Sequence, residues 1–154
     1  MRCRARLARI WRRKNISGPV RLAPDARLIG LNWPGVPVLR SGVASEDDAA
    51  GVCMALAGIA ETGTLLLASG PEAPSSLNFL PETHIVVLPG AQIVGALEDA
   101  WRELRRLNNG QMPRTVNLIS GPSRTADIAM TMFMGAHGPK RLHVILVGDH
   151  DPAT

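Results

Sequence analysis

Apolar positions occur in short runs along this chain, and the spacing inside each run separates strands from helices. Mostly apolar runs lie at 65–68, 83–88, 115–119 and 142–147, each bounded by glycine, proline or polar residues. Runs of this length and composition predict buried strands. The stretch 51–59 is small and apolar throughout, and its pattern is compatible with a helix or with a buried strand.

Helical spacing is clearest over 93–107. Apolar residues recur there at i, i+3 and i+4, charged residues fill the other positions, and Asn109-Gly110 is a typical helix stop. The basic segment 1–15 is also predicted to be helical, because Leu7, Ile10 and Trp11 suit one apolar face. A short edge strand is predicted at 27–31.

Strands that alternate with helices across short turns predict an α/β protein. We expect three layers, with a mostly parallel sheet covered on both faces. Ligands of such sheets gather at the carboxyl ends of the strands. The expected division is a basic N-terminal segment at 1–15, a single α/β domain at 16–148 and a flexible tail at 149–154.

Composition and charge narrow the possible partners. The chain has 154 residues, of which 45% are hydrophobic and 19% charged, the balance of one globular domain. The first fourteen positions hold seven basic residues and no acidic one, so the remainder carries −3 against +4 for the whole chain. With 3% aromatic residues and no tyrosine, a nucleic-acid partner is not expected. No apolar run approaches the ~20 residues of a membrane span, and the start lacks the apolar core of a secretory signal.

Cysteine and histidine give little sign of a cofactor in this chain. Cys3 and Cys53 are too few for a disulfide framework or for a cluster held by four thiolates. Cys53 lies in an apolar run, which predicts a reduced, buried thiol and fits a cytoplasmic protein. His84, His137, His143 and His150 show none of the spacings of a metal site, so no metal is predicted.

Polar chemistry is concentrated in the stretch 117–128. A buried strand ends there, Gly121-Pro122 breaks it, and Ser123 can cap a helix predicted over 126–134. Free backbone N–H groups and a helix dipole would make this turn an anion pocket. Arg124 could clamp a carboxylate or phosphate. In the alternative, Arg124 pairs with Asp127 in an ordinary capped helix.

A second polar group, Glu61-Thr62-Gly63, interrupts the longest apolar region. A carboxylate between apolar neighbours could be desolvated and act as a base or nucleophile. The alternative is a turn glutamate that accepts backbone N–H bonds, with Gly63 at positive φ. His137, before Gly138-Pro139, is expected at a helix exit, where it would bond the last free carbonyls.

Together these blocks resemble the lactate-utilization (LUD) domain family, and within it most closely the lactate utilization protein C group. The resemblance runs from about residue 15 to residue 147, in order and at sensible spacing. It is carried by Ile59-Ala60-Glu61-Thr62-Gly63-Thr64-Leu65, by Leu80-Pro81-Glu82-Thr83-His84-Ile85, by Ile119-Ser120-Gly121-Pro122-Ser123-Arg124-Thr125-Ala126-Asp127-Ile128, and by Gly135-Ala136-His137-Gly138-Pro139 with Leu142-His143-Val144.

The resemblance implies a fold like that of ribose-5-phosphate isomerase, glucosamine-6-phosphate deaminase and the CoA transferases (the NagB/RpiA/CoA transferase-like fold). It also implies a part in oxidising L-lactate to pyruvate, as an accessory subunit rather than an independent catalyst. Iron–sulfur clusters are then expected in partner subunits and none in this chain. A small organic anion would bind Thr62, Gly63, Ser120, Gly121, Ser123, Arg124, Thr125, Asp127 and His137.

Two other functions remain open at this point. A glutamate-x-glycine turn also surrounds the catalytic glutamate of CoA transferases, so Glu61 could accept an acyl group in a small-molecule enzyme. The chain could also be a degenerate, inactive copy. The family usually has a Glu and often a Gln where this chain has Ala129 and Met130, and family members generally have a longer region before residue 15.

Overall fold

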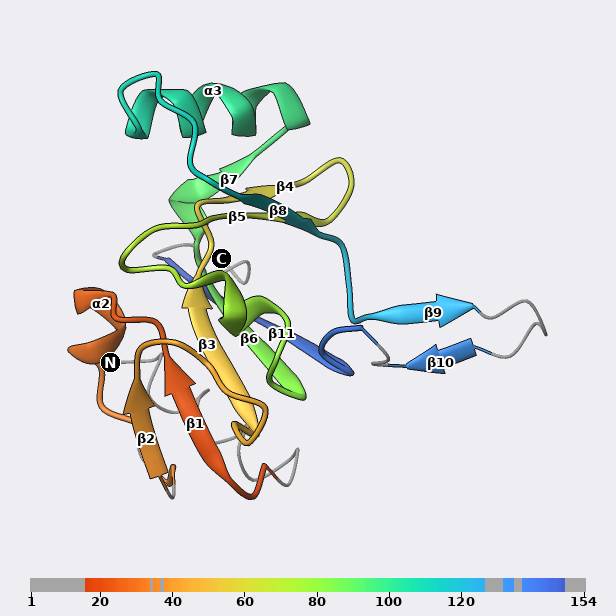
Figure 1. Cartoon of the computed structure of the whole chain (residues 1–154). Coiled ribbons are helices and arrows are strands. Elements are labelled where there is room, and N and C mark those ends of the chain that lie inside the picture. Colours follow the sequence, from red (N-terminus) through yellow and green to blue (C-terminus); the bar gives the residue numbers. More distant parts are fainter. Residues whose placement is uncertain (1–15, 34, 37, 127–131, 135–136, 149–154) are drawn as a thin grey trace, which may run out of the picture.

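The computed structural model describes residues 16–33, 35–36, 38–126, 132–134 and 137–148, and most of its strands belong to two sheets (Figure 1). The larger sheet has five strands in the order β11-β6-β3-β1-β2, and every neighbouring pair is parallel. Its strands are β1 (Pro19–Leu22), β2 (Val38–Ser41), β3 (Ala50–Met54), β6 (Thr83–Pro89) and β11 (Arg141–Val147). The α/β class with a mostly parallel sheet is therefore confirmed.

The smaller sheet has four strands in the order β7-β4-β5-β8. Its strands are β4 (Ala57–Ile59), β5 (Thr64–Ala68), β7 (Ile93–Val94) and β8 (Val116–Ile119). β5 is antiparallel to both β4 and β8, whereas β4 and β7 are parallel. In Figure 1 this sheet lies between helix α3 (Leu97–Leu107) and the larger sheet.

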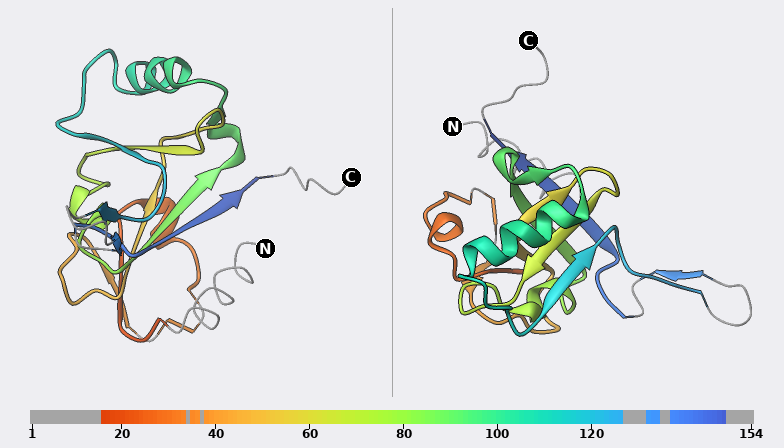
Figure 2. Two further views of the ribbon diagram at one scale, coloured as in Figure 1. Left: turned by 90° about the vertical axis from the view of Figure 1, so that its right-hand side faces the viewer. Right: turned by 90° about the horizontal axis from the view of Figure 1, so that it is seen from above.

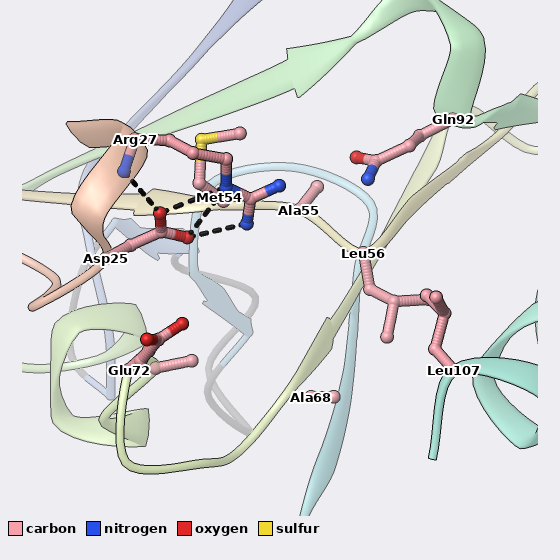
Figure 3. A pocket seen from close by; sticks show the side chains of 10 residues that line it. Asp25, Arg27, Met54, Ala55, Leu56, Ala68, Glu72, Gln92 and Leu107 are labelled. Atoms are coloured by element: carbon pink, nitrogen blue, oxygen red, sulfur yellow. Dashed lines mark hydrogen bonds and ion pairs between the residues drawn. The ribbon is translucent and has the colours of Figure 1, made fainter. Parts of the chain in front are cut away.

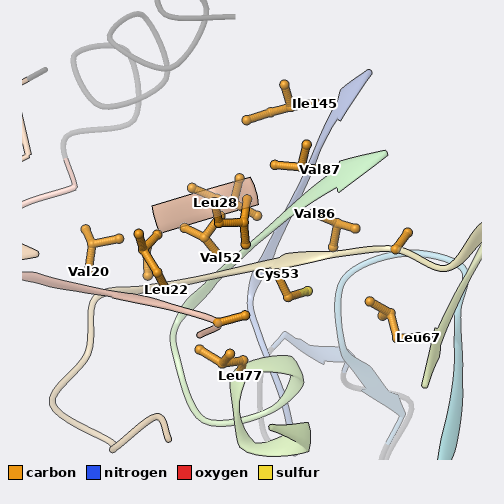
Figure 4. Packing of buried hydrophobic residues seen from close by; sticks show 14 of the residues in the cluster. Val20, Leu22, Leu28, Val52, Cys53, Leu67, Leu77, Val86, Val87 and Ile145 are labelled. Atoms are coloured by element: carbon orange, nitrogen blue, oxygen red, sulfur yellow. The ribbon is translucent and has the colours of Figure 1, made fainter. Parts of the chain in front are cut away.

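Successive side chains of β5 belong to two separate hydrophobic cores. Leu65 and Leu67 join the core of the larger sheet, whereas Leu66 packs with Ala100 and Leu104 of α3 in a second cluster. Successive side chains of a strand point to opposite faces, so one strand serves both cores. Figure 4 shows the larger core, to which Leu67 of β5 and Cys53 of β3 both belong.

Burial follows each strand's place in the larger sheet. β6 lies between β11 and β3, and all of its residues but the last are buried. This is the expectation for an inner strand covered on both faces. β2 forms one edge of the sheet, and all four of its residues are exposed.

Two predicted elements are wrong. The helix predicted over 126–134 is contradicted by the described residues at both of its ends: β9 (Arg124–Ala126) and β10 (Met132–Met134) pair as antiparallel strands. This hairpin extends away from the body of the molecule (Figure 2). The periodicity of a short apolar run does not distinguish a helix from a strand. β-branched and aromatic residues such as Thr125 and Phe133 favour an extended backbone.

The edge strand predicted at 27–31 is a short helix, α2 (Ala26–Ile29). Asp25 provides the missing signal, because its carboxylate accepts the amide of Arg27 at 2.8 Å as an N-cap. The residues 51–59, which were ambiguous, are the strands β3 and β4. The remaining elements are the 3₁₀ turns η1 (Ser75–Asn78) and η2 (Gly90–Gln92).

The helix predicted over 93–107 begins later, at Leu97, because Ile93 and Val94 pair with β4 as a strand. The strands predicted at 65–68, 83–88, 115–119 and 142–147 are confirmed with small changes of boundary. The basic segment 1–15 and the tail 149–154 lie outside the described residues.

Candidate functional site

The two polar motifs singled out in the sequence meet at one end of the smaller sheet. β5 and β8 are antiparallel with Leu65 opposite Ile119, so the start of β5 faces the end of β8. The hydroxyl oxygens of Thr64 and Ser120 lie 2.7 Å apart. The hydroxyl of Thr62 donates to that of Thr64 at 2.8 Å. Thr62, Thr64 and Ser120 thus form a continuous chain of hydroxyl groups, called here the hydroxyl chain.

The two ends of the hydroxyl chain lie at the protein surface, and its middle residue is buried. Thr64 is buried, with 7% of its surface exposed, whereas Thr62 and Ser120 are exposed. Thr64 accepts from Thr62, so its own proton can go to Ser120. The proton of Ser120 is then left for an external acceptor. Thr64 was missed as a site residue in the sequence, although it directly follows the Glu-Thr-Gly motif.

Glu61 has a structural bond in this turn. One carboxylate oxygen, Oε1, accepts the backbone N–H of Leu97, the first residue of α3, at 2.9 Å. Gly63 has φ of +64°, the conformation that the turn-glutamate alternative requires. The carboxylate therefore satisfies a free donor at a helix N-terminus, where negative charge also complements the helix dipole. This geometry agrees with the interpretation of Glu61 as a turn glutamate that accepts backbone N–H bonds.

Replacing Glu61 by alanine is expected to lower the free energy of unfolding by about 1 kcal/mol, the usual cost of losing an N-terminal cap. Urea denaturation followed by circular dichroism measures this change. Glu46→Ala is the matched control, because Glu46 is an exposed glutamate outside α3. A Glu61→Ala variant no less stable than the control would contradict the capping role.

Ser123 belongs to a second group of residues. Its backbone N–H donates to the carbonyl of Pro139 at 2.9 Å, and a side-chain carbon at Gly138 would lie 3.3 Å from Cβ of Ser123. This close contact joins the loop after β8 to the turn that holds His137. β10, not a helix, comes before that turn. His137 therefore has no helix exit to cap, and that expectation is wrong.

His137 lies on the rim of a pocket of about 470 Å³ near the amino ends of β6 and β11. The other lining residues are Glu46, Phe79, Leu80, Pro81, Glu82, Gly138 and Lys140. Of the residues predicted as one site, Thr62 and Ser120 belong to the hydroxyl chain, and His137 belongs to this pocket. Arg124 is exposed at the start of β9. Asp127, Ala129 and Met130 lie outside the described residues.

Cys53 and His84 form a buried polar pair in the larger sheet. The sulfur of Cys53 lies 3.1 Å from Nε2 of His84 and 3.8 Å from Oδ1 of Asn78. Burial raises the pKa of the Cys53 thiol to about 12 and lowers the pKa of the His84 imidazole to about 4. Both groups are therefore neutral near pH 7. The predicted buried, reduced thiol is confirmed, and it lacks the thiolate character of a nucleophile.

In the part of the chain that the structure describes, no three His, Cys, Asp or Glu side chains gather in a way that could hold a metal ion. Among the same residues, no helix is long and apolar enough to cross a membrane.

The chain is similar to proteins of one family. The model of the LUD domain matches residues 44–147. An uncharacterized protein of Neisseria meningitidis is 42% identical over 102 residues, which are 66% of this chain and 43% of that protein. Lactate utilization protein C of Bacillus subtilis is 32% identical over 152 residues, covering 86% of this chain and 63% of that protein. This chain thus spans about half the length of the curated relatives it matches.

One solved structure shares the fold. The crystal structure of a DUF162 family protein from Deinococcus radiodurans superposes with a TM-score of 0.51 and covers 94% of this chain and 98% of that one. The two sequences are 20% identical, so this likeness concerns the fold alone.

Proposed function

Because this chain belongs to the LUD domain family, we propose that it takes part in lactate utilization, as an accessory subunit in the oxidation of L-lactate to pyruvate. The relatives named lactate utilization protein C support this role. In this proposal the chain binds a small organic anion, such as lactate or pyruvate, at the loop 120–125. The iron–sulfur clusters that carry the electrons belong to partner subunits.

The hydroxyl chain is the observation that carries the proposed anion site. Thr64 and Ser120 are 56 positions apart in the sequence, yet their oxygens lie within one hydrogen bond. An anion beside Ser120 would accept the outward hydroxyl proton, and Thr62 and Thr64 would hold that hydroxyl in place. Donors fixed in advance bind an acceptor without further ordering cost.

Arg124 would supply the positive charge, four residues after Ser120 and on the exposed start of β9. Arg124 begins the strand β9 and not the first turn of a helix, and the amide of Ser123 is already bonded to the carbonyl of Pro139. Anion binding in this account therefore depends on the Arg124 guanidinium and on the hydroxyl chain. In this proposal Glu61 caps the N-terminus of α3.

Arg124→Ala is expected to abolish the rise in melting temperature that L-lactate, pyruvate or phosphate gives the wild-type chain. Loss of a charge-assisted contact should weaken binding by about 2 kcal/mol. Differential scanning fluorimetry over a range of anion concentrations measures the effect. Arg114→Ala is the control, because Arg114 is an exposed arginine just before β8. An equal shift in Arg124→Ala and wild type would contradict the proposed site.

The proposed partnership has a separate test. A tagged copy of this chain, expressed with candidate iron–sulfur subunits of a lactate-utilization system, is expected to retain one of these proteins on affinity purification. The visible absorption of the clusters identifies that partner. Recovery of the chain alone, under conditions in which those proteins are folded and loaded, would contradict the accessory-subunit role.

A further inference from the structure

The pocket of about 470 Å³ that His137 borders has an exposed apolar wall. Phe79 is 44% exposed and Leu80 is 43% exposed, and both line the pocket together with the buried Pro81. Large apolar side chains that are exposed next to each other and surrounded by polar residues are typical of a surface that binds polypeptide. The surface formed by Phe79, Leu80 and Pro81 is called here the apolar shelf.

The turn beside the apolar shelf is acidic. Glu46 lines the same pocket, Asp47 follows it, and both residues are exposed. Neither carboxylate forms an ion pair with a described residue. Glu82, also in the lining, is already paired with Lys140 at 3.7 Å and with Arg141 at 3.3 Å. The negative charge of Glu46 and Asp47 is therefore not offset, and it favours a basic occupant.

The basic segment 1–15 joins the described chain close to this pocket. A side-chain carbon at Gly18 would lie 2.9 Å from Cβ of Ala49. The carbonyl of Ala49 accepts the amide of Thr83 at 3.2 Å, and Thr83 directly follows Glu82. From Gly18 to the pocket is therefore about two strand spacings, or about 10 Å. A helix of fifteen residues would be about 22 Å long, which is enough to cross the apolar shelf.

Another pocket, of about 310 Å³, lies at the opposite, carboxyl ends of β1 and β3 (Figure 3). The guanidinium of Arg27 donates there to Asp25 through Nε at 3.0 Å and Nη2 at 2.6 Å, so these two charges offset each other. The segment 1–15 joins β1 from its amino end. The apolar shelf is therefore the closer of these two surfaces to the basic segment.

The sequence of the segment complements both the shelf and the acidic turn. It holds seven basic residues and no acidic one. In the helix predicted from the sequence, Leu7, Ile10 and Trp11 share one face. Arg4 and Lys14 are three or four positions from these residues, so they lie on the same side of the helix. An amphipathic helix of this kind lays its apolar face into an apolar groove.

We propose that the apolar shelf is the docking site of the chain's own segment 1–15. The apolar face of the segment packs against Phe79 and Leu80, and the basic residues on that side lie beside Glu46 and Asp47. This contact within one chain goes beyond the function proposed above and does not rest on it.

A nitroxide spin label on Cys3 of the ¹⁵N-labelled full chain tests the proposal by NMR. Cys53 is the other cysteine and is only 3% exposed, so the label attaches to Cys3. The unpaired electron broadens the amide signals of residues near the label. We expect broadening at Leu80 and Glu82 and none at Gln111, which follows α3. Raising the salt concentration from about 0.05 M to about 0.5 M should reduce the broadening, because salt screens the charges.

Two variants remove the apolar contact, one from each side. Phe79→Ser and Trp11→Ser should each weaken docking about tenfold or more, the effect of losing a buried aromatic side chain, and the broadening should fall with it. Ile93→Ser is the matched control, because Ile93 is also 44% exposed but lies on β7, outside this pocket. Equal melting temperatures establish that Phe79→Ser keeps the fold. Trp11→Ser tests the same contact without changing a described residue.

A mixture of unlabelled ¹⁵N chain and spin-labelled chain of natural isotope content separates contacts within one chain from contacts between copies. The proposal predicts no broadening in this mixture. Broadening of the shelf amides in the mixture would instead assign the shelf to a second copy and would overturn the proposal. Broadening that spares residues 79–82 in the labelled chain, or that persists in both Phe79→Ser and Trp11→Ser, would overturn it as well.

Discussion

Lowering the pH from 7 to 4 is expected to reduce the free energy of unfolding by about 3 kcal/mol through His84 alone. Burial lowers the pKa of this imidazole from 6.5 to about 4. Between these two values the unfolded chain binds a proton at this histidine and the folded chain does not. Each unit of pKa difference corresponds to about 1.4 kcal/mol. Stability is therefore fully present above pH 6.5 and is lost as the pH falls toward 4.

Urea denaturation at several pH values between 7 and 4 measures this dependence. Other groups also titrate in acid. The hydrogen bonds from Arg27 lower the pKa of the Asp25 carboxyl, so this carboxylate loses its contribution to the free energy of unfolding as acid protonates it. A His84→Gln variant keeps those groups. Between pH 7 and pH 4 its free energy of unfolding should fall by about 3 kcal/mol less than that of the wild type. His137→Gln, at an exposed histidine, should retain the wild-type slope. An unchanged slope in His84→Gln would contradict the neutral, buried imidazole.

Leu66→Ala is expected to lower the free energy of unfolding by about 3 kcal/mol. Leu66 is fully buried between the smaller sheet and α3, where it packs with Ala100 and Leu104. Truncation removes its transfer free energy and leaves a cavity that the surrounding strands fill only in part. The cluster has few buried members, so this single change should loosen the packing of α3.

Leu118→Ala is the matched control, because Leu118 of β8 lies directly opposite Leu66 in the sheet register. Leu118 is 45% exposed, so its truncation should cost less than about 1 kcal/mol. Chemical denaturation of both variants at pH 7 gives the comparison. Equal losses of stability in the two variants would show that α3 does not cover Leu66 as the structure places it.

Local sequence pattern predicted the more apolar strands well and several other elements poorly. The runs that became β5, β6, β8 and β11 are mostly apolar and bounded by turn residues, so length and composition identify them. The error at 27–31 arose because the capping bond from Asp25 outweighs the apolar character of Leu28 and Ile29. The hairpin of β9 and β10 was missed because a run of a few apolar residues fits the period of a helix as well as that of a strand.

The candidate site could not be predicted from local sequence alone, because its residues meet only in the tertiary structure. Thr64 and Ser120 are joined by the register of β5 and β8, which no local pattern encodes. The sequence paired the two motifs through their resemblance to a family, and the structure brings Thr62, Thr64 and Ser120 together. The pocket beside Asp25 escaped prediction because β1 was not expected, so the strand ends that form it could not be aligned.

The most direct test of the proposed function is an NMR titration of the ¹⁵N-labelled chain with L-lactate and with pyruvate. The account predicts saturable shifts of the amide signals of Thr62, Thr64 and Ser120 to Arg124, which follow a common dissociation constant. It also predicts that the amides around Gln92 keep their positions. Shifts confined to other residues, or none at saturating concentrations of both anions, would contradict the assignment of this junction as the anion site.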